Sequence, residues 1–386
     1  MSKSIMKKLR KLKNKLIVVS GVSFPNDLDS FIKEIDDLEI ETIDDIERSF
    51  WAYKLQKKYT QYSSLRKNAI AIFSFLSLFV LILMLFFKKV NKVKDTNTVY
   101  YRVSHNEGIL PQFYKNMPDL ETVEFGSEMS WDKDVRKVLH EIIKRYGLYP
   151  DFLLTVLFSL ANYNSLIRRF QPNEIVTSYE SSVSCAILTY YCNLHGIRHV
   201  NIMHGEKLLT QNNLLGRFDV MYMWDNYYVD LFKRLKYKTS EYKIHNPWRE
   251  IELPEPTEKH DITFYLNFIN EEECQILISV IEKLSEKGFD AIVRMHPSQL
   301  GTGIADTLKR SVKVENNSDV SIFQSIANTE RCASQFSTVL FQAYSLGKAI
   351  VIDDLTNPTI YEKICKLDYI MLSKENIKLS ELVYIR

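Results

Sequence analysis

Three short clusters of polar residues follow apolar, strand-like stretches in the part of the chain beyond residue 170. They are His204-Gly205-Glu206, Arg294-Met295-His296-Pro297 and Ser337-Thr338. Imidazole, carboxylate and hydroxyl groups next to a glycine or proline suit two tasks, binding a phosphate and taking a proton from a hydroxyl. If the preceding stretches are parallel strands, all three clusters lie at carboxyl ends of strands, where α/β proteins bind ligands.

The pair Ser337-Thr338 is a candidate phosphate site because it begins a predicted helix. Free backbone N–H groups, hydroxyls and the positive end of the helix dipole bind phosphate there without a basic side chain. In the cluster about forty residues earlier, His296 can donate to a phosphate oxygen and Pro297 fixes the turn after it. Arg294 would add a positive charge. An ordinary N-cap and a loop histidine are the alternatives.

The cluster at His204 is a candidate site for the base that deprotonates an acceptor hydroxyl. His204, Glu206 and Glu180, one strand-helix unit earlier, could each take that proton. Gly205 lets the backbone pass close to a ligand. The alternative for Glu180 and Glu206 is that they cap neighbouring helices.

Several classes of protein are excluded by what the sequence lacks. It has no GxGxxG and no GxxxxGK[ST], which argues against a dinucleotide dehydrogenase and a P-loop kinase. We expect no metal and no cofactor, with the phosphate neutralised by His296 and helix dipoles. A net charge of +2 in 386 residues does not favour nucleic acid as a partner. The five cysteines form no CxxC pair and suit buried thiols in a reducing compartment.

The elements needed to position these clusters alternate between strand-like and helix-like segments, which is typical of an α/β fold. Predicted strands cover residues 98–103, 174–179, 199–203, 220–224, 261–267, 291–296, 312–315, 331–334 and 349–353. Predicted helices cover residues 135–146, 151–169, 183–194, 227–235, 271–287, 321–327 and 338–346. A polar, proline-marked stretch from Asn246 to His260 separates two halves. We expect two Rossmann-like domains facing a cleft, an acceptor domain over residues 98–250 and a nucleotide-donor domain over residues 258–386.

The first 67 residues form a basic region with helices. Seven of the first sixteen residues are Lys or Arg, with leucines at spacings of three and four. This start is either a solubilising tail or a foothold on anionic lipid.

Residues 68–87 contain no charge, and we interpret residues 68–88 as a membrane-embedded helix. At 1.5 Å per residue twenty residues reach about 30 Å, the thickness of the hydrocarbon core of a bilayer. Basic residues flank both ends, so the positive-inside rule does not choose an orientation. A crossing with the N-terminus outside, or a helix dipping into one leaflet, would keep the large part of the chain on the cytoplasmic side, where nucleotide donors are found.

The order His204-Gly205, His296-Pro297 and Gln335-Phe336-Ser337-Thr338-Val339, with Lys348-Ala349-Ile350-Val351 after it, resembles the GT-B transferases of bacterial surface polymers. It is similar to the CDP-glycerol glycerophosphotransferases of teichoic-acid synthesis and to the bacterial capsular sialyl- and polysialyltransferases. The resemblance covers roughly residues 174–354. Gln335, where the teichoic-acid enzymes have Asp, and Glu206, where they have a small residue, depart from the pattern.

The resemblance implies that His296, Ser337 and Thr338 hold the phosphate of the donor. It implies His204 as the base in the glycerophosphotransferase pattern, and a carboxylate, Glu206 or Glu180, in the sialyltransferase pattern.

We therefore expect a membrane-associated, metal-independent glycosyltransferase of capsule or O-antigen synthesis at the bacterial inner membrane, with its catalytic domains on the cytoplasmic side. Its partners would be a nucleotide-sugar donor, CMP-linked in one version, and a lipid-linked or oligosaccharide acceptor. The alternatives are a CDP-glycerol or CDP-ribitol phosphotransferase and a non-catalytic, membrane-anchored assembly protein.

Overall fold

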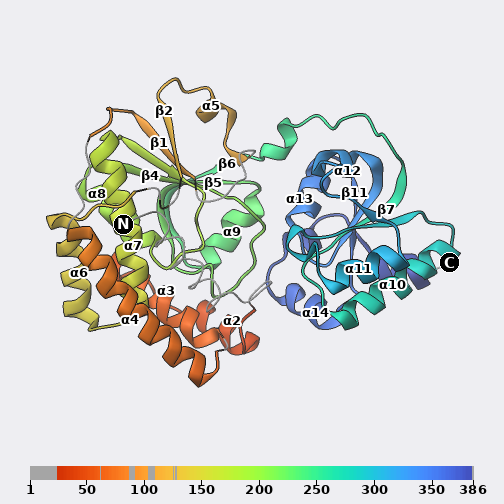
Figure 1. The fold of residues 1–386 in the computed structure, drawn as a ribbon, viewed down its shortest axis with the longest axis horizontal. Coiled ribbons are helices and arrows are strands. Elements are labelled where there is room, and N and C mark those ends of the chain that lie inside the picture. Colours follow the sequence, from red (N-terminus) through yellow and green to blue (C-terminus); the bar gives the residue numbers. More distant parts are fainter. Residues whose placement is uncertain are drawn as a thin grey trace. The chain divides into compact units, whose positions relative to one another are not determined.

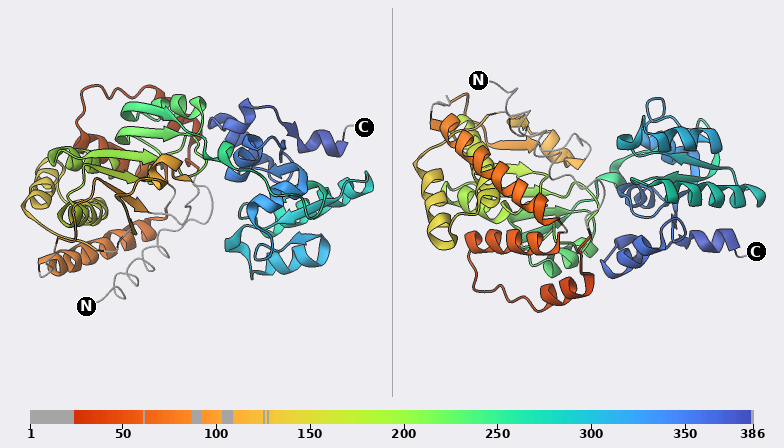
Figure 2. Two further views of the ribbon diagram at one scale, coloured as in Figure 1. Left: turned by 90° about the horizontal axis from the view of Figure 1, so that it is seen from above. Right: turned by 60° about the horizontal axis from the view of Figure 1, so that its bottom comes forward.

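The computed structural model describes residues 24–60, 62–86, 92–102, 109–124, 126 and 128–384 (Figure 1, Figure 2). They form two compact units. The first contains the described residues as far as His204 together with Leu209–His245. The second contains Gly205–Leu208 and the described residues from Asn246 onward. The basic start of the chain, residues 1–16, lies outside the described residues.

The first unit is built on a six-stranded parallel sheet in the order β2-β1-β3-β4-β5-β6. The strands are β1 (Thr98–Arg102), β2 (Leu120–Glu124), β3 (Glu174–Thr177), β4 (Arg198–Ile202), β5 (Arg217–Met223) and β6 (Lys238–Ile244). Parallel neighbours require crossover connections, which here contain α5 (Gln112–Lys115), α6 (Lys133–Tyr146), α7 (Pro150–Phe170), α8 (Cys185–Leu194) and α9 (Asn226–Arg234). The central strands are therefore buried by helices on both sides and rich in apolar and β-branched residues.

Helix α7 is the long apolar helix of this unit, and most of its side chains are buried. Pro150 at its first turn suits a helix start because the missing N–H has no partner there anyway. The helix ends where Gln171 adopts a left-handed conformation, φ 44°. Its apolar face forms one core with β1, β3 and α8.

Three helices precede the first sheet: α2 (Leu28–Asp36), α3 (Asp45–Tyr59) and α4 (Ser64–Phe86). Asp27 and Asp44 cap the first two, accepting from backbone N–H groups at 3.1 and 2.8 Å. Helix α3 packs on α8, and α4 runs along α7 (Figure 1). By length and composition alone, the segment Ser64–Leu85 could cross a membrane.

The second unit is built on another six-stranded parallel sheet, in the order β12-β11-β10-β7-β8-β9. The strands are β7 (His260–Tyr265), β8 (Ala291–Arg294), β9 (Val314–Glu315), β10 (Thr329–Ser334), β11 (Ala349–Ile352) and β12 (Ile377–Lys378). The helices are α10 (Glu271–Glu286), α11 (Gly303–Ser311), α12 (Ile322–Asn328), α13 (Thr338–Ser345), α14 (Pro358–Lys366) and α15 (Leu379–Tyr384). Short 3₁₀ helices are η2 (Pro247–Glu250), η3 (Pro297–Gln299) and η4 (Ile370–Ser373).

The predicted class, two Rossmann-like α/β halves with an apolar helix in the N-terminal part, is confirmed. Each predicted strand has an observed counterpart, and the helix boundaries agree within two residues, apart from the start of the apolar helix, which differs by four. The apolar helix begins at Ser64 rather than residue 68, because Leu65, Arg66 and Lys67 continue the helical pattern. Four of the five cysteines are buried thiols, as expected, and Cys365 is exposed.

Candidate functional site

Both sheets contain the feature that creates a binding site in open parallel α/β sheets. The first strand of each unit lies inside its sheet, and connections leave it in opposite directions: β1 lies between β2 and β3, and β7 lies between β8 and β10. Ligands bind at the carboxyl ends of strands beside such a switch point. In the second unit β7, β8 and β10 lead into Asn267, His296 and Ser337, and in the first unit β3 and β4 lead into Glu180 and His204.

Glu180 and His204 form a hydrogen-bonded pair. Strands β3 and β4 are neighbours, so the loops after them meet at one edge of the sheet. His204 Nδ1 lies 3.0 Å from Glu180 Oε2, and the backbone N–H of His204 donates to Glu180 Oε1 at 3.3 Å. The Glu180 side chain is completely buried, whereas that of His204 is 27% exposed. Two of the three candidate bases are thus brought together, and only His204 reaches solvent.

This geometry gives the two residues different tasks. A carboxylate that holds Nδ1 selects the tautomer with the proton on Nδ1, which leaves the lone pair on Nε2. Nε2 can then take a proton from a hydroxyl, while the carboxylate stabilises the positive charge that develops on the ring. His204 is therefore the candidate base, and Glu180 positions it. Glu180 does not cap a helix in the described structure.

The carboxylate of Glu180 is itself fixed by residues that sequence reasoning missed. Asn201 on β4 donates from Nδ2 to Glu180 Oε2 at 3.3 Å and accepts at Oδ1 from the Tyr179 N–H at 3.0 Å. The Tyr237 hydroxyl donates to the Glu180 carbonyl at 2.6 Å. The only sequence signal was the position of Asn201 inside an apolar strand, where a polar side chain must find partners.

The Tyr237 ring packs directly against Gly216, where a side chain would otherwise lie. We predict that Gly216→Ala disturbs the packing of Tyr237. An added Cβ would overlap the ring, and both residues are buried. Overpacking of this kind costs about 1–3 kcal/mol, so hydrogen exchange in β5 should become about 5–150-fold faster. Tyr237→Phe, which keeps the ring but loses the hydroxyl, is the matched control for the hydrogen bond to Glu180. Unchanged exchange in Gly216→Ala would contradict the prediction.

Glu206 is not part of the pair formed by Glu180 and His204. Its segment, Gly205–Leu208, is grouped with the second unit, where the Glu206 N–H donates to Thr338 Oγ1 at 3.2 Å. Its carboxylate accepts from the Lys207 N–H at 3.1 Å. The carboxylate also contributes to raising the pKa of the Tyr369 hydroxyl, although burial of that hydroxyl is the larger cause.

The predicted phosphate site lies at the N-terminus of α13. Ser337 is the N-cap, in an extended conformation, and its hydroxyl accepts from the Val339 N–H at 3.2 Å. The loop before it is held by Asn267, which donates from Nδ2 to the Phe336 carbonyl. His296 is exposed and follows β8, and Pro297 begins η3. Because β10, β7 and β8 are adjacent, these groups follow three neighbouring strands at one edge of the sheet.

Arg294 has a structural contact that the sequence did not indicate. Its guanidinium forms an ion pair with Glu315 on β9, and it donates to the Val320 carbonyl at 3.0 Å. The Arg294 and Glu315 side chains are 10% and 6% exposed. Its predicted contact with phosphate stays a prediction.

A small pocket at the carboxyl ends of β7, β10 and β11 contains further polar groups. Asn267, Gln335, Asp353 and Thr356 contribute to its lining. Gln335 Nε2 has no hydrogen-bond partner among the described residues, so it could bind a ligand group. Burial raises the pKa of Asp353, whose carboxylate accepts from the Leu355 and Thr356 N–H groups, as a turn residue does. Among the described residues no group of three or more His, Cys, Asp or Glu side chains could hold a metal.

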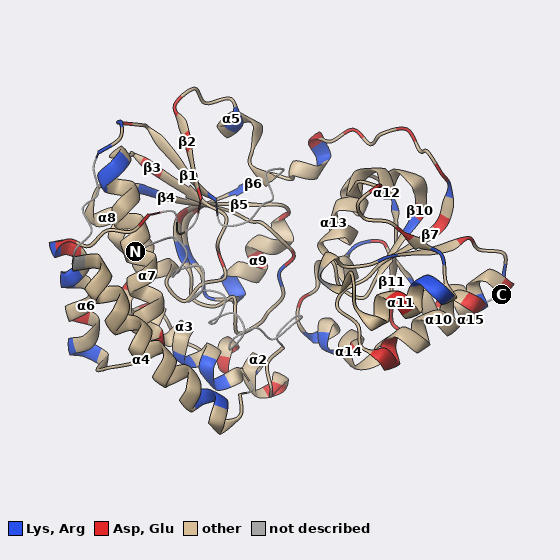
Figure 3. Cartoon of the chain, viewed as in Figure 1, with Lys and Arg blue, Asp and Glu red and all other residues tan. Residues whose placement is uncertain are grey.

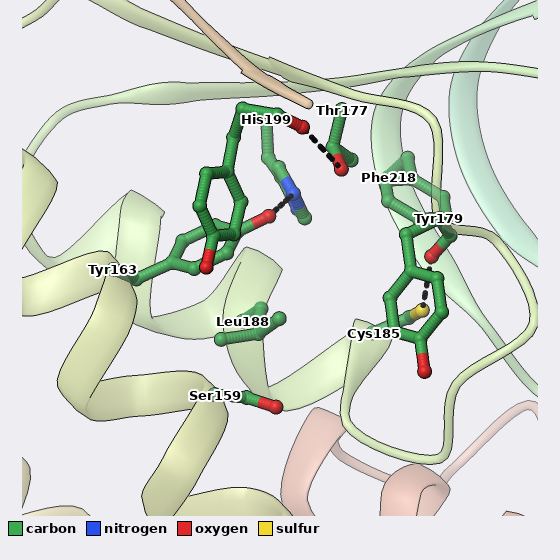
Figure 4. Close-up of a pocket in the computed structure, with 9 residues that line it drawn as sticks. Ser159, Tyr163, Thr177, Tyr179, Cys185, Leu188, His199 and Phe218 are labelled. Atoms are coloured by element: carbon green, nitrogen blue, oxygen red, sulfur yellow. Dashed lines mark hydrogen bonds between the residues drawn. The ribbon is translucent and has the colours of Figure 1, made fainter. Parts of the chain in front are cut away.

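A second small pocket lies inside the first unit and is structural (Figure 4). His199 Nε2 lies 2.8 Å from the Tyr163 hydroxyl, and Nδ1 lies 2.7 Å from Thr189 Oγ1. Because Thr189 donates to the Arg217 carbonyl, its oxygen accepts from Nδ1–H, and Nε2 then accepts from Tyr163. The neutral ring is thus fully satisfied, and burial lowers the pKa of His199 to about 3.

We predict that His199 makes the first unit sensitive to acid. Its pKa is 6.5 in its ordinary state and about 3 when folded, so the unfolded chain gains the proton first and stability falls as the pH drops from 6.5 toward 3. Between pH 7 and pH 5 this costs about 2 kcal/mol. Hydrogen exchange in β4, corrected for intrinsic rates, should show this loss, and His199→Gln should reduce the pH dependence by that amount. Equal pH dependence in the two proteins would contradict the prediction.

Comparisons with known proteins give similarity of fold only. No family model matches the chain, and no curated protein matches it. Among solved structures, the chain is similar to Staphylococcus aureus MnaA with UDP, at 9% identity and a TM-score of 0.45, covering 67% of this chain and 79% of that one. It is similar to the wall teichoic acid polymerase TagF with CDPG, at 11% identity and a TM-score of 0.41, covering 85% of this chain and 84% of that one. It is also similar to the UDP-GlcNAc 2-epimerase of Methanocaldococcus jannaschii in complex with UDP-GlcNAc and UDP. The identity is 12% and the TM-score 0.44, covering 72% of this chain and 94% of that one.

Proposed function

We propose that the chain is a metal-independent transferase of bacterial surface-polymer synthesis. It moves a group from a nucleotide-activated donor to a hydroxyl of a growing polymer, on the cytoplasmic side of the inner membrane. The observation that carries the proposal is the pair formed by the half-buried His204 and the fully buried Glu180. A buried carboxylate that fixes one nitrogen of an accessible histidine is the arrangement of a general base.

The donor phosphates bind in the second unit in this proposal. Ser337 and the N-terminus of α13 supply N–H groups and a positive dipole, and His296 supplies a ring N–H. These groups stabilise the negative charge that develops on the leaving nucleotide. His204 removes the acceptor proton as the new bond to oxygen forms, and the nucleotide leaves with the electrons of the bond that breaks.

Two transferred groups fit this chemistry, and the geometry favours one of them. In the sialyltransferase pattern a carboxylate would be the base, but Glu180 is completely buried and Glu206 accepts from its neighbouring N–H. In the glycerophosphotransferase pattern the base is the histidine, as the pair of His204 with Glu180 provides. We therefore place alditol-phosphate transfer from a CDP donor first and glycosyl transfer from a nucleotide sugar second.

A thermal-shift panel tests the donor class. The full-length protein in detergent is heated with CMP, CDP, UMP, UDP or GDP. A ligand at a hundredfold excess over its Kd stabilises the folded state by about 2.7 kcal/mol, which is a measurable shift. We expect a cytidine-specific shift that is weakened in His296→Ala and in Ser337→Ala.

The matched control is Thr302→Ala. Thr302 is the N-cap of α11 in the same unit, and its hydroxyl accepts from the Ala305 N–H as that of Ser337 accepts from Val339. Loss of either cap costs about 1 kcal/mol of stability, but only loss of Ser337 should weaken the nucleotide shift. A shift with uridine or guanosine nucleotides alone would exclude both cytidine donors. No shift with any nucleotide would favour a non-catalytic protein.

A further inference from the structure

Helix α4 has two opposite faces that differ in their environment. The exposed face, named here the α4 stripe, consists of Leu65, Ile72, Phe75, Leu76, Phe79 and Leu83, which are 82%, 64%, 57%, 58%, 60% and 46% exposed. The buried face consists of Ser74, Ser77, Leu81 and Leu85, which are 4%, 7%, 4% and 2% exposed. At about 100° per residue, each set falls within an arc of about 100°, and the two arcs lie on opposite sides of the helix.

The buried face attaches α4 to the first unit. Leu81 and Leu85 belong to the same core as the apolar side chains of α7, and Leu78 and Ile82 pack against that core. The small Ser74 and Ser77 on this face let the helix lie close to its neighbour. A helix that crossed the bilayer by itself would present both faces to lipid, whereas in the described structure one face is already covered by protein.

The basic residues around α4 indicate what covers the α4 stripe. Between residues 48 and 94 the sequence has ten Lys and Arg and no Asp or Glu, whereas the remainder has 40 Lys and Arg against 48 Asp and Glu. In Figure 3 the basic residues of α3 and of the start of α4 are drawn in blue. Four of them form ion pairs with acids: Lys57 with Asp151, Lys58 with Glu34, Lys92 with Asp95 and Lys94 with Glu121. An apolar stripe flanked by cations is complementary to a bilayer that contains anionic lipid.

We infer that α4 lies flat on the surface of an anionic bilayer, with the α4 stripe inserted among the lipids and the opposite face held by α7. The helix is an in-plane anchor and not a membrane span. Trp51 on the preceding helix α3, 42% exposed, is of the type that enriches membrane interfaces. The inference rests on the packing of α4 and stands whatever group the protein transfers.

Vesicle binding tests the α4 stripe directly. Purified full-length protein is mixed with preformed vesicles of phosphatidylcholine alone or with one third phosphatidylglycerol, and the bound fraction is measured by sedimentation. We expect tighter binding to the anionic vesicles, and a loss of at least about 10-fold in Phe75→Glu/Phe79→Glu, because charged side chains do not enter the apolar region. Leu148→Glu, at a position 70% exposed in the same unit, is the matched control and should bind as the wild type does. Equal binding by the double variant would overturn the inference.

Depth measurements separate an in-plane helix from a crossing one. In a Cys365→Ser background, which removes the exposed native thiol, single cysteines at positions 65, 72, 76 and 83 carry a fluorophore. Quenching by lipids labelled at different depths should place all four at one shallow depth. A profile that is deepest at position 76 and shallow at both ends would show a crossing. A dimer in detergent-free buffer that the double variant converts to a monomer, without vesicle binding, would make a second copy the occupant and would also overturn the inference.

Discussion

Replacing His204 with alanine is expected to lower kcat by about 10²–10⁴-fold, the usual contribution of a general base. The loss follows from the position of the ring: its Nδ1 is held by Glu180 at 3.0 Å, and its side chain is partly exposed to solvent. Turnover is measured as nucleotide released from the donor that the thermal-shift panel selects. His195→Ala is the matched control, because His195 is an exposed histidine of the same unit.

Glu180→Gln separates a positioning residue from a purely structural one. Glutamine keeps the shape and can still accept from Nδ1–H, but it carries no charge to stabilise the protonated ring. We expect kcat to fall while KM for the donor and the nucleotide thermal shift stay unchanged, because the proposed phosphate site belongs to the other unit. Full activity of His204→Ala would exclude the histidine as the base. A fall in donor affinity with unchanged kcat in Glu180→Gln would assign Glu180 to binding.

The sequence predicts the strands whose patterns are strong and misses those at the sheet edges. The buried central strands are short, continuous apolar runs, such as Ala349–Ile352, and these are found. The missed strands are β2, β6 and β12, which occupy three of the four edge positions. Strand β6 alternates little and is mostly polar because one side of an edge strand has no neighbour to bury it. Its position depends on pairing with β5, which local sequence does not encode.

The candidate site is predicted at the level of residue types but not of partners. His204 and Glu180 are each plausible bases in the sequence, and only the adjacency of β3 and β4 shows that one orients the other. Asn267 could not be found because its role, holding the Phe336 carbonyl, depends on β7 lying beside β10. The partner of Arg294, Glu315, is 21 residues away on another strand. In all three cases the partner is brought close by the pairing of strands that are far apart in the sequence.

Replacing Glu315 with alanine is expected to destabilise the second unit by about 3–5 kcal/mol. The change leaves the buried Arg294 guanidinium without its counter-ion, and an uncompensated buried charge is among the most destabilising features in a protein. Hydrogen exchange of the β8 amides measures that unit separately, and protection should fall by about 10²–10⁴-fold. The same substitution at Glu330, which pairs with Arg331 at the surface, is the control and should change protection little.

The double variant Arg294→Met/Glu315→Leu decides what Arg294 does. Apolar side chains of similar volume can replace a buried ion pair at little cost, so we expect most of the protection in β8 to return relative to Glu315→Ala. If the ion pair is the whole function of Arg294, the double variant also keeps the nucleotide thermal shift, because His296 and Ser337 remain. If Arg294 also contacts the donor phosphate, the unit is stable but the shift is reduced. The double variant therefore distinguishes an effect on stability from an effect on ligand binding. Replacing Arg294 or Glu315 alone cannot do so, because either change leaves one buried charge unpaired.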